Sequence, residues 1–137
     1  MTFEPEMPTV PPRGPMPEPR LDKPQCCPRR LEGLLRALGR EACSEFCARV
    51  VSDLTQSEER LLAHDVQDGD PVELQQQAHI LRGIAGTVGA DDFQKTATLV
   101  LATASDSLHG PTARDAINLL LVYLRATRAE MAPHGAP

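Results

Sequence analysis

Apolar residues recur at the spacing of an α-helix in successive segments of this chain, and proline or glycine separates the segments. Spacings of three and four residues place such side chains on one face of a helix. Aromatic residues are few, namely Phe3, Phe46, Phe93 and Tyr123, and tryptophan is absent. A core must therefore be built from aliphatic side chains. This pattern predicts an all-α protein in which amphipathic helices pack against one another.

The first part of the chain, residues 1–29, is expected to form a disordered tail. Nine of the 13 prolines lie there, and proline neither fits a helix interior nor donates a backbone hydrogen bond. Such a segment favours an extended polyproline II conformation. Residues 8–11 and 12–15 also fit the loose P-x-x-P pattern of peptides that bind aromatic grooves. A flexible leader and a docking peptide therefore both stay open.

After this proline-rich tail, the pattern predicts a short accessory helix and four longer helices. The short helix is expected over 31–38 and ends at Gly39. The longer helices are expected at about 40–67, 71–88, 92–107 and 112–129. Short connections between successive helices imply antiparallel neighbours. We therefore expect an antiparallel up-down four-helix bundle over residues 30–131, followed by a flexible end over 132–137.

The four cysteines favour structural roles over metal binding. Cys43 and Cys47 lie one helical turn apart on an apolar stripe, which is typical of small core side chains. A zinc site would need paired Cys-x-x-Cys or Cys/His spacings, which the sequence lacks, so no metal site is predicted. The adjacent Cys26 and Cys27 are expected to be exposed at the end of the tail and prone to oxidation.

The segment over 71–88 carries the candidate chemistry. Read as a helix, it turns one apolar stripe inward and holds His79 on the opposite, polar face. Gly83 and Gly86 follow on that face, and an interior glycine costs a helix about 0.5–1 kcal/mol relative to alanine. We infer that another molecule approaches the backbone there. A neutral imidazole is nucleophilic near pH 7, and Arg82 would offset the charge of a phosphoryl group. The pattern predicts phosphoryl transfer through a phosphohistidine.

The residues His79-Ile80-Leu81-Arg82-Gly83, followed by Ala85-Gly86 and Val88-Gly89, resemble the signature of the histidine-containing phosphotransfer (HPt) domains. The resemblance implies a four-helix bundle that passes a phosphoryl group between aspartates of receiver domains in a multistep phosphorelay, a form of two-component signal transduction. It implies that His79 is the phosphoacceptor and that Arg82 stabilises the phosphoryl group. We expect five further residues to contribute to partner docking: Gln75, Gln76, Gly83, Gly86 and Lys95.

Three positions depart from the family pattern. Arg82 stands where lysine is usual, and its planar guanidinium gives a different geometry with a phosphoryl group. Ile84 stands where a small residue is more usual, so it either packs inward or widens the docking surface. Some HPt domains have a glutamine on the following helix that reaches the site, and Leu101 occupies that position here.

The resemblance also bears on partners and cofactors. It implies receiver domains of a hybrid sensor kinase or of response regulators as partners, with Mg²⁺ expected on the receiver, no cofactor on this chain and no kinase activity of its own. The net charge of −5 argues against nucleic-acid binding. Without a segment that could cross a bilayer and without a signal peptide, a cytoplasmic monomer is expected.

Two alternatives stay open at this point. The first is an HPt-like interaction module that binds a receiver or kinase domain without carrying phosphate. The second is a plain helical scaffold whose functional part is the proline-rich tail. Dependence of binding on aspartyl phosphorylation would separate the first from phosphotransfer, and deletion of the tail would test the second.

Overall fold

The computed structural model describes residues 17–135, and within this range the regular elements are all helical. Five α-helices follow one another, with a short 3₁₀-helix before the last. Their bounds are α1 Pro28–Leu38, α2 Arg40–Ala63, α3 Pro71–Val88, α4 Asp91–Ala102, η1 Ser105–Ser107 and α5 Gly110–Gly135. The prediction of an all-α protein is confirmed.

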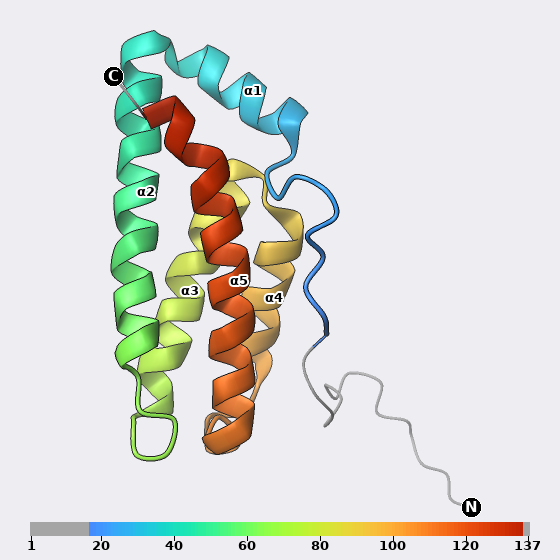
Figure 1. Cartoon of the computed structure of the whole chain (residues 1–137), viewed down its shortest axis with the longest axis vertical. Helices are drawn as coiled ribbons and strands as arrows, with labels where there is room; N and C mark the ends of the chain where they lie inside the picture. Colours follow the sequence, from blue (N-terminus) through green and yellow to red (C-terminus); the bar gives the residue numbers. More distant parts are fainter. Residues whose placement is uncertain (1–16, 136–137) are drawn as a thin grey trace, which may run out of the picture.

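The helices form a bundle-like arrangement with one element across its end. Figure 1 shows α2, α3, α4 and α5 side by side along the long axis, while α1 crosses the end where α2 begins. The most extensive pairings join α2 to α5 and α3 to α4. Between them, Phe93 of α4 stacks on Tyr123 of α5 with ring centroids 6.1 Å apart, and the rest of the core is mainly aliphatic. In the described part of the chain no helix has both the length and the apolarity needed to cross a bilayer.

The helix that carries His79 begins and ends as its sequence predicts. The Asp70 side chain accepts a hydrogen bond from the Val72 backbone N–H at 2.9 Å, and Pro71 occupies the first turn. At the other end Gly89 adopts a left-handed conformation with φ 76°, which glycine accepts without steric cost. The Asp70–Pro71 start and the Gly89 end therefore give α3 the bounds that the sequence predicts.

The other long helices differ from the predicted bounds. α2 stops at Ala63 instead of continuing to residue 67, because the Asp65 carboxylate accepts the backbone N–H groups of Gln67 and Asp68 in a turn. α4 stops at Ala102 instead of 107. α5 begins at residue 110 and runs to residue 135, and Met131, expected near a frayed end, is fully buried.

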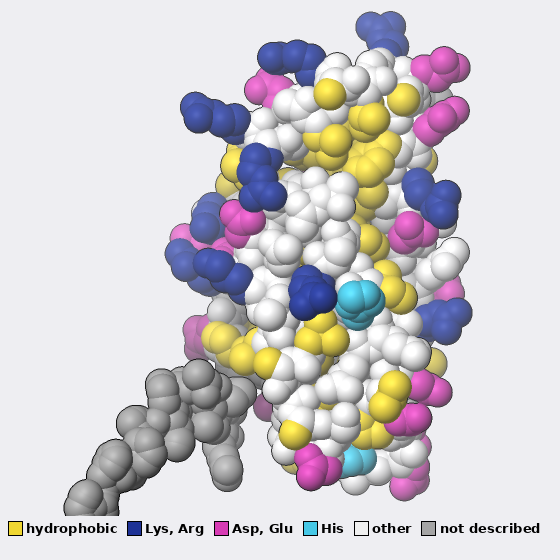
Figure 2. All heavy atoms as spheres, turned by 180° about the vertical axis from the view of Figure 1, so that it is seen from behind, with side chains coloured by type: hydrophobic (Ala, Val, Ile, Leu, Met, Phe, Trp, Pro, Cys, Tyr) yellow, Lys and Arg dark blue, Asp and Glu magenta, His cyan; other side chains and the backbone are white. Residues whose placement is uncertain are grey.

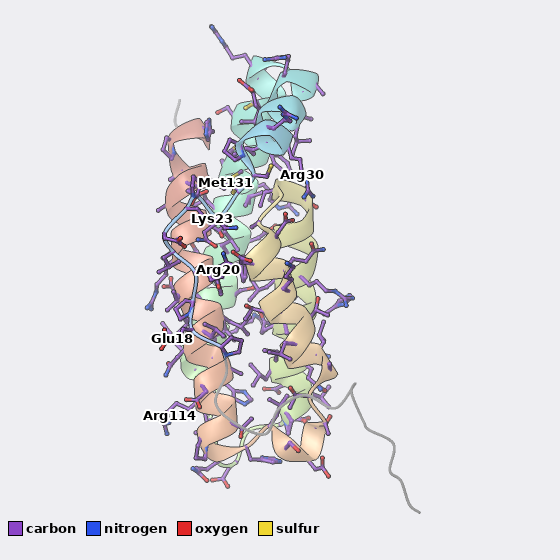
Figure 3. The ribbon with its side chains drawn as sticks, turned by 90° about the vertical axis from the view of Figure 1, so that its right-hand side faces the viewer. Glu18, Arg20, Lys23, Arg30, Arg114 and Met131 are labelled. Carbon is purple, nitrogen blue, oxygen red and sulfur yellow. The ribbon has the colours of Figure 1, made fainter. Side chains whose placement is uncertain are left out.

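The predicted tail is ordered over its second half. Residues 17–27, which we call the strap, run along α5 as an extended segment, and Figure 3 shows Glu18, Arg20 and Lys23 on it. The Glu130 carboxylate on α5 accepts the backbone N–H of Gln25 at 2.6 Å and of Cys26 at 2.8 Å. The prediction of disorder up to residue 29 is therefore wrong for residues 17–29. Residues 1–16 of the predicted tail, and residues 136 and 137 of the predicted flexible end, lie outside the described residues.

The strap also corrects the interpretation of the adjacent cysteines. Cys26 is buried at 2% exposure and pairs in a single β-bridge with Ala90, at the start of α4. Burial, together with the nearby Glu130 carboxylate, raises the pKa of the Cys26 thiol to about 12. Cys26 is thus a shielded and unreactive thiol, whereas Cys27 is half-buried. Cys47 is fully buried and Cys43 packs beside the core, as predicted.

Candidate functional site

The two faces of α3 separate as the sequence predicts. Its buried residues are Leu74, Ala78, Leu81, Ala85 and Val88. His79 is exposed on the opposite side of the helix, so the backbone that supports the imidazole is fixed by core packing while the ring itself faces solvent. We call the solvent-facing side of α3 the His79 face. A rigid helix with an exposed imidazole can present that ring to another macromolecule without a change of fold.

Arg82 lies directly beside the histidine. Its Nη2 atom is 3.4 Å from Nδ1 of His79, one helical turn away. The ion pairs within residues 17–135 do not include Arg82, so no carboxylate of that range neutralises its charge. An imidazole and a guanidinium group without an ion pair in the described range are therefore brought together. The face of the molecule in Figure 2 carries such a neighbouring histidine and basic side chain near its centre, with hydrophobic side chains around them.

The two glycines of the His79 face have different surroundings. A Cβ atom built on Gly83 would meet nothing within 4 Å, so the helix surface beside His79 is open. A Cβ on Gly86 would lie 2.7 Å from Nε2 of Gln94, because the Gln94 side chain of α4 rests there. Gly83 thus leaves room for an incoming group, whereas Gly86 makes room for α4. The sequence predicts the same docking role for both glycines, because it does not show what packs against each of them.

The two predicted docking glutamines also differ. The Gln75 amide donates to the Thr103 carbonyl at 2.9 Å and accepts from the Ser105 hydroxyl at 3.0 Å, which ties the end of α4 to α3. Both ends of that amide are therefore used inside the fold. Gln76 is exposed and lines a hollow of about 270 Å³ between the end of α2 and the start of α3. Of the two, Gln76 is the one available to a partner.

Lys95, the fifth predicted docking residue, belongs to α4 and not to the helix that carries His79. It follows Gln94, which contacts Gly86, and Gly86 is seven residues or about 10 Å along α3 from His79. Lys95 is exposed on α4, so it adds charge at the edge of the His79 face. Arg30 of α1 is near the same end, since it donates to the Gly86 carbonyl at 3.3 Å and pairs with Asp91 at 2.9 Å.

Two aliphatic side chains on the His79 face were not singled out from the sequence. Val72 and Ile80 are 48% and 46% exposed, although both belong to a helix that has a well-filled core side. On a helical projection both residues fall outside the buried stripe of α3, and this signal in the sequence would have identified them as exposed. Ile84 and Leu101, the two departures from the HPt pattern, are partly buried and pack against the core. Ile84 therefore packs inward and does not widen the exposed surface.

The residues around His79 form an open surface and not an enclosed pocket. His79 is not among the residues that line the neighbouring hollow, which are Arg60, Leu61, Ala63, His64, Glu73, Leu74, Gln76 and Gln77. In the part of the chain that the structure describes, no three His, Cys, Asp or Glu side chains are placed to hold a metal ion. An exposed imidazole on the surface of a helix is accessible to a group that another macromolecule carries.

Comparison of this chain with protein-family models, with curated proteins and with solved structures finds no match. The resemblance to HPt domains therefore rests on the sequence signature of α3 and on the arrangement of His79, Arg82 and Gly83.

Proposed function

We propose that this protein is a histidine phosphotransfer protein of the HPt type. In this proposal, His79 accepts a phosphoryl group from the aspartyl phosphate of a receiver domain and passes it to the aspartate of a response regulator in a two-component phosphorelay. The observation that carries the proposal is the placement of His79 beside the open Gly83 surface and beside Arg82, which forms no ion pair in the described part of the chain. The proposed framework is an antiparallel up-down four-helix bundle formed by α2 to α5, with α1 as the accessory helix.

Each proposed transfer is an in-line displacement at phosphorus. In the first transfer a ring nitrogen of His79 forms the new N–P bond while the P–O bond to the donor's aspartate breaks, and its electron pair leaves with the carboxylate. In the second transfer a carboxylate oxygen of the response regulator forms the new O–P bond while the N–P bond breaks, and its electron pair stays on the ring nitrogen. Arg82 can donate to the phosphoryl oxygens and stabilise their charge. Positioning and electrostatics supply most of the catalysis in such reactions. The proposed role of this chain is thus that of a carrier without kinase activity or a cofactor of its own.

The surface around His79 supports a protein as the phosphoryl donor. Ile80, next to His79 in the chain, and Val72, two turns earlier, expose aliphatic surface on the His79 face, and Gln76 adds a polar side chain between them. A receiver domain docking there would cover apolar area around a polar centre, which is the usual composition of a transient interface. We propose a cytoplasmic location and a monomeric state for the same carrier.

The test is transfer of labelled phosphate. Receiver proteins of the same organism, phosphorylated on aspartate with radioactive phosphate, are mixed with the wild type, His79→Gln and His109→Gln. His109 is also exposed but precedes α5, so its variant is the matched control. We expect an acid-labile, base-stable label on the wild type and on His109→Gln, and none on His79→Gln.

Other results would change the assignment. Label that persists on His79→Gln would overturn the role of His79. Binding of a receiver without any label on the wild type would favour the interaction module, because exposed Val72 and Ile80 serve docking whether or not phosphate moves. Circular dichroism of each variant confirms that loss of label is not loss of fold.

A further inference from the structure

The contact between Arg82 and His79 has a consequence for the protonation of the imidazole. A guanidinium group has five N–H donors and no acceptor. At 3.4 Å from Nδ1, Arg82 can only donate, so the contact requires a lone pair on Nδ1. In the neutral ring the single proton must then sit on Nε2. The geometry therefore selects one of the two neutral tautomers.

This tautomer leaves neither nitrogen ready to attack. Nε2 is the ring nitrogen further from the Cβ atom, but in this tautomer it carries the proton. Nδ1 has the lone pair, but the guanidinium of Arg82 lies over it. No carboxylate or amide of the described residues hydrogen-bonds the His79 ring to favour the other tautomer; the Gln75 amide, one turn earlier, is used by Thr103 and Ser105. Arg82 is therefore the polar neighbour that decides the tautomer.

We propose that Arg82 is a positioning residue that keeps His79 in the unreactive Nε2–H tautomer until a phosphoryl group draws the guanidinium away. This inference rests on the proposed phosphotransfer function. Arginine binds anionic phosphoryl oxygens through charge-assisted hydrogen bonds that are frequently bidentate, whereas the imidazole offers it one neutral lone pair. The incoming phosphoryl group thus competes successfully for Arg82, and Nδ1 becomes free.

The activation step then needs only water. Nδ1 takes a proton from water while Nε2 gives its proton to water, which converts the ring to the Nδ1–H tautomer without net charge change. The Nε2 lone pair attacks phosphorus, the P–O bond to the partner's carboxylate breaks, and the carboxylate leaves with that electron pair. The proton on Nδ1 stays on the phosphorylated ring. The resting contact thereby couples nucleophile activation to the presence of a phosphoryl group.

The test measures the tautomer directly and without a phosphoryl donor. Two-bond proton–nitrogen correlation spectra of protein labelled with ¹⁵N-histidine report which nitrogen of His79 is protonated, at a pH where the ring is neutral. We expect Nε2–H in the wild type and in Arg82→Lys, because lysine is also only a donor. Arg82→Ala removes the donor and adds no acceptor, so we expect it to shift the tautomer ratio towards Nδ1–H by about fivefold, the ratio that one ordinary hydrogen bond gives. Equal ratios in the wild type and Arg82→Ala would overturn the proposal.

A second measurement follows the site of phosphorylation. Phosphoramidate, a small phosphoryl donor that needs no protein partner, is expected to phosphorylate Nε2 of the wild type. Phosphorylation of Nδ1 would overturn the shielding role of Arg82. These readouts separate the two proposals: failure of receiver proteins to label His79 counts against the phosphorelay function, whereas an unchanged tautomer ratio counts against Arg82 alone.

Discussion

Two arginines of α5 and the arginine of α3 differ in whether a carboxylate of the described part of the chain pairs with them. On α5, Arg125 and Arg128 both bond the Glu58 carboxylate of α2 at 2.7 Å. On α3, the one hydrogen-bond contact of the Arg82 side chain within residues 17–135 is with the His79 imidazole. Glu58 is 15% exposed, and its pair of arginines holds α2 against α5. The arginines that join α2 to α5 are thus neutralised by a carboxylate. The arginine at the proposed partner-binding surface is not neutralised by a carboxylate of the described range.

Two further polar side chains of α5, Glu130 and Tyr123, also join distant segments of the chain. Glu130 accepts two backbone N–H groups of the strap, and the Tyr123 hydroxyl accepts a third from Arg20 at 2.8 Å. The open site beside His79 on α3 has no such cross-link, since Gly83 offers no side chain and nothing approaches it. Variants on α5 should therefore change stability, and variants of Arg82 or Gly83 should mainly change transfer.

The largest effect is expected for Glu58. Glu58→Ala leaves two guanidinium groups without their carboxylate, and we expect the free energy of unfolding to fall by about 2–3 kcal/mol. Urea denaturation at pH 7 measures this loss. The exposed neighbour Glu59 provides the control, since Glu59→Ala should change stability by less than about 0.5 kcal/mol.

The same residue predicts a pH dependence. Hydrogen bonds from Arg128 and then Arg125 lower the pKa of Glu58 to about 2, from an ordinary value of 4.5. A carboxyl group with a lowered folded-state pKa stabilises the fold above its unfolded pKa, and this contribution is lost as pH falls towards the folded-state pKa. The wild type should lose this stability between about pH 4.5 and 2, and Glu58→Gln should lack that component. Parallel stability curves for the two proteins would contradict the assignment.

A somewhat smaller loss is expected when the strap is released. Glu130→Ala removes the acceptor of the buried N–H groups of Gln25 and Cys26, which should cost about 2 kcal/mol. Glu130→Gln keeps one acceptor oxygen and should lose less. Alkylation of Cys26 by iodoacetamide, measured by mass spectrometry, should accelerate in Glu130→Ala. Unchanged protection of Cys26 would show that the strap holds without Glu130.

The expected effect of Arg82 is on transfer and not on stability. Arg82→Ala removes a charge-assisted contact with the phosphoryl group and should slow label uptake by His79 about tenfold. The free energy of unfolding should change by less than about 0.5 kcal/mol, because the side chain forms no ion pair within the described residues. Arg82→Lys should retain most of the rate, and Arg40→Ala, at an exposed site outside the His79 face, should retain all of it.

The smallest expected effect is the difference in stability between alanine variants of Gly83 and Gly86. Gly83→Ala should stabilise the protein by about 0.5–1 kcal/mol, since open space surrounds the added methyl group. Gly86→Ala should gain less, because Gln94 must move from a position 2.7 Å from the new Cβ. Thermal unfolding measures both. In the transfer assay, the bulkier Gly83→Leu should hinder labelling of His79, and labelling at the wild-type rate would show that the open surface is not required.

Local signals in the sequence were enough to predict the all-α class and the position of α3. The Asp70 cap, Pro71 in the first turn and Gly89 at the end act over a few residues, so they can be read without knowledge of neighbouring helices. The two faces of α3 follow from helical spacing alone, and they placed His79, Arg82 and Gly83 together. The phosphotransfer function and the docking residues stay predictions.

Contacts between distant segments were decided only in the tertiary structure. The proline content of residues 17–29 indicated disorder, but Glu130, more than one hundred residues away, satisfies the strap backbone and buries Cys26. The different roles of Gly83 and Gly86 likewise depend on where the Gln94 side chain of α4 lies. Helix periodicity determines which residues share a face, because it is a property of one helix; it does not determine which segment fills that face, because packing and long-range hydrogen bonds join residues that local sequence does not relate.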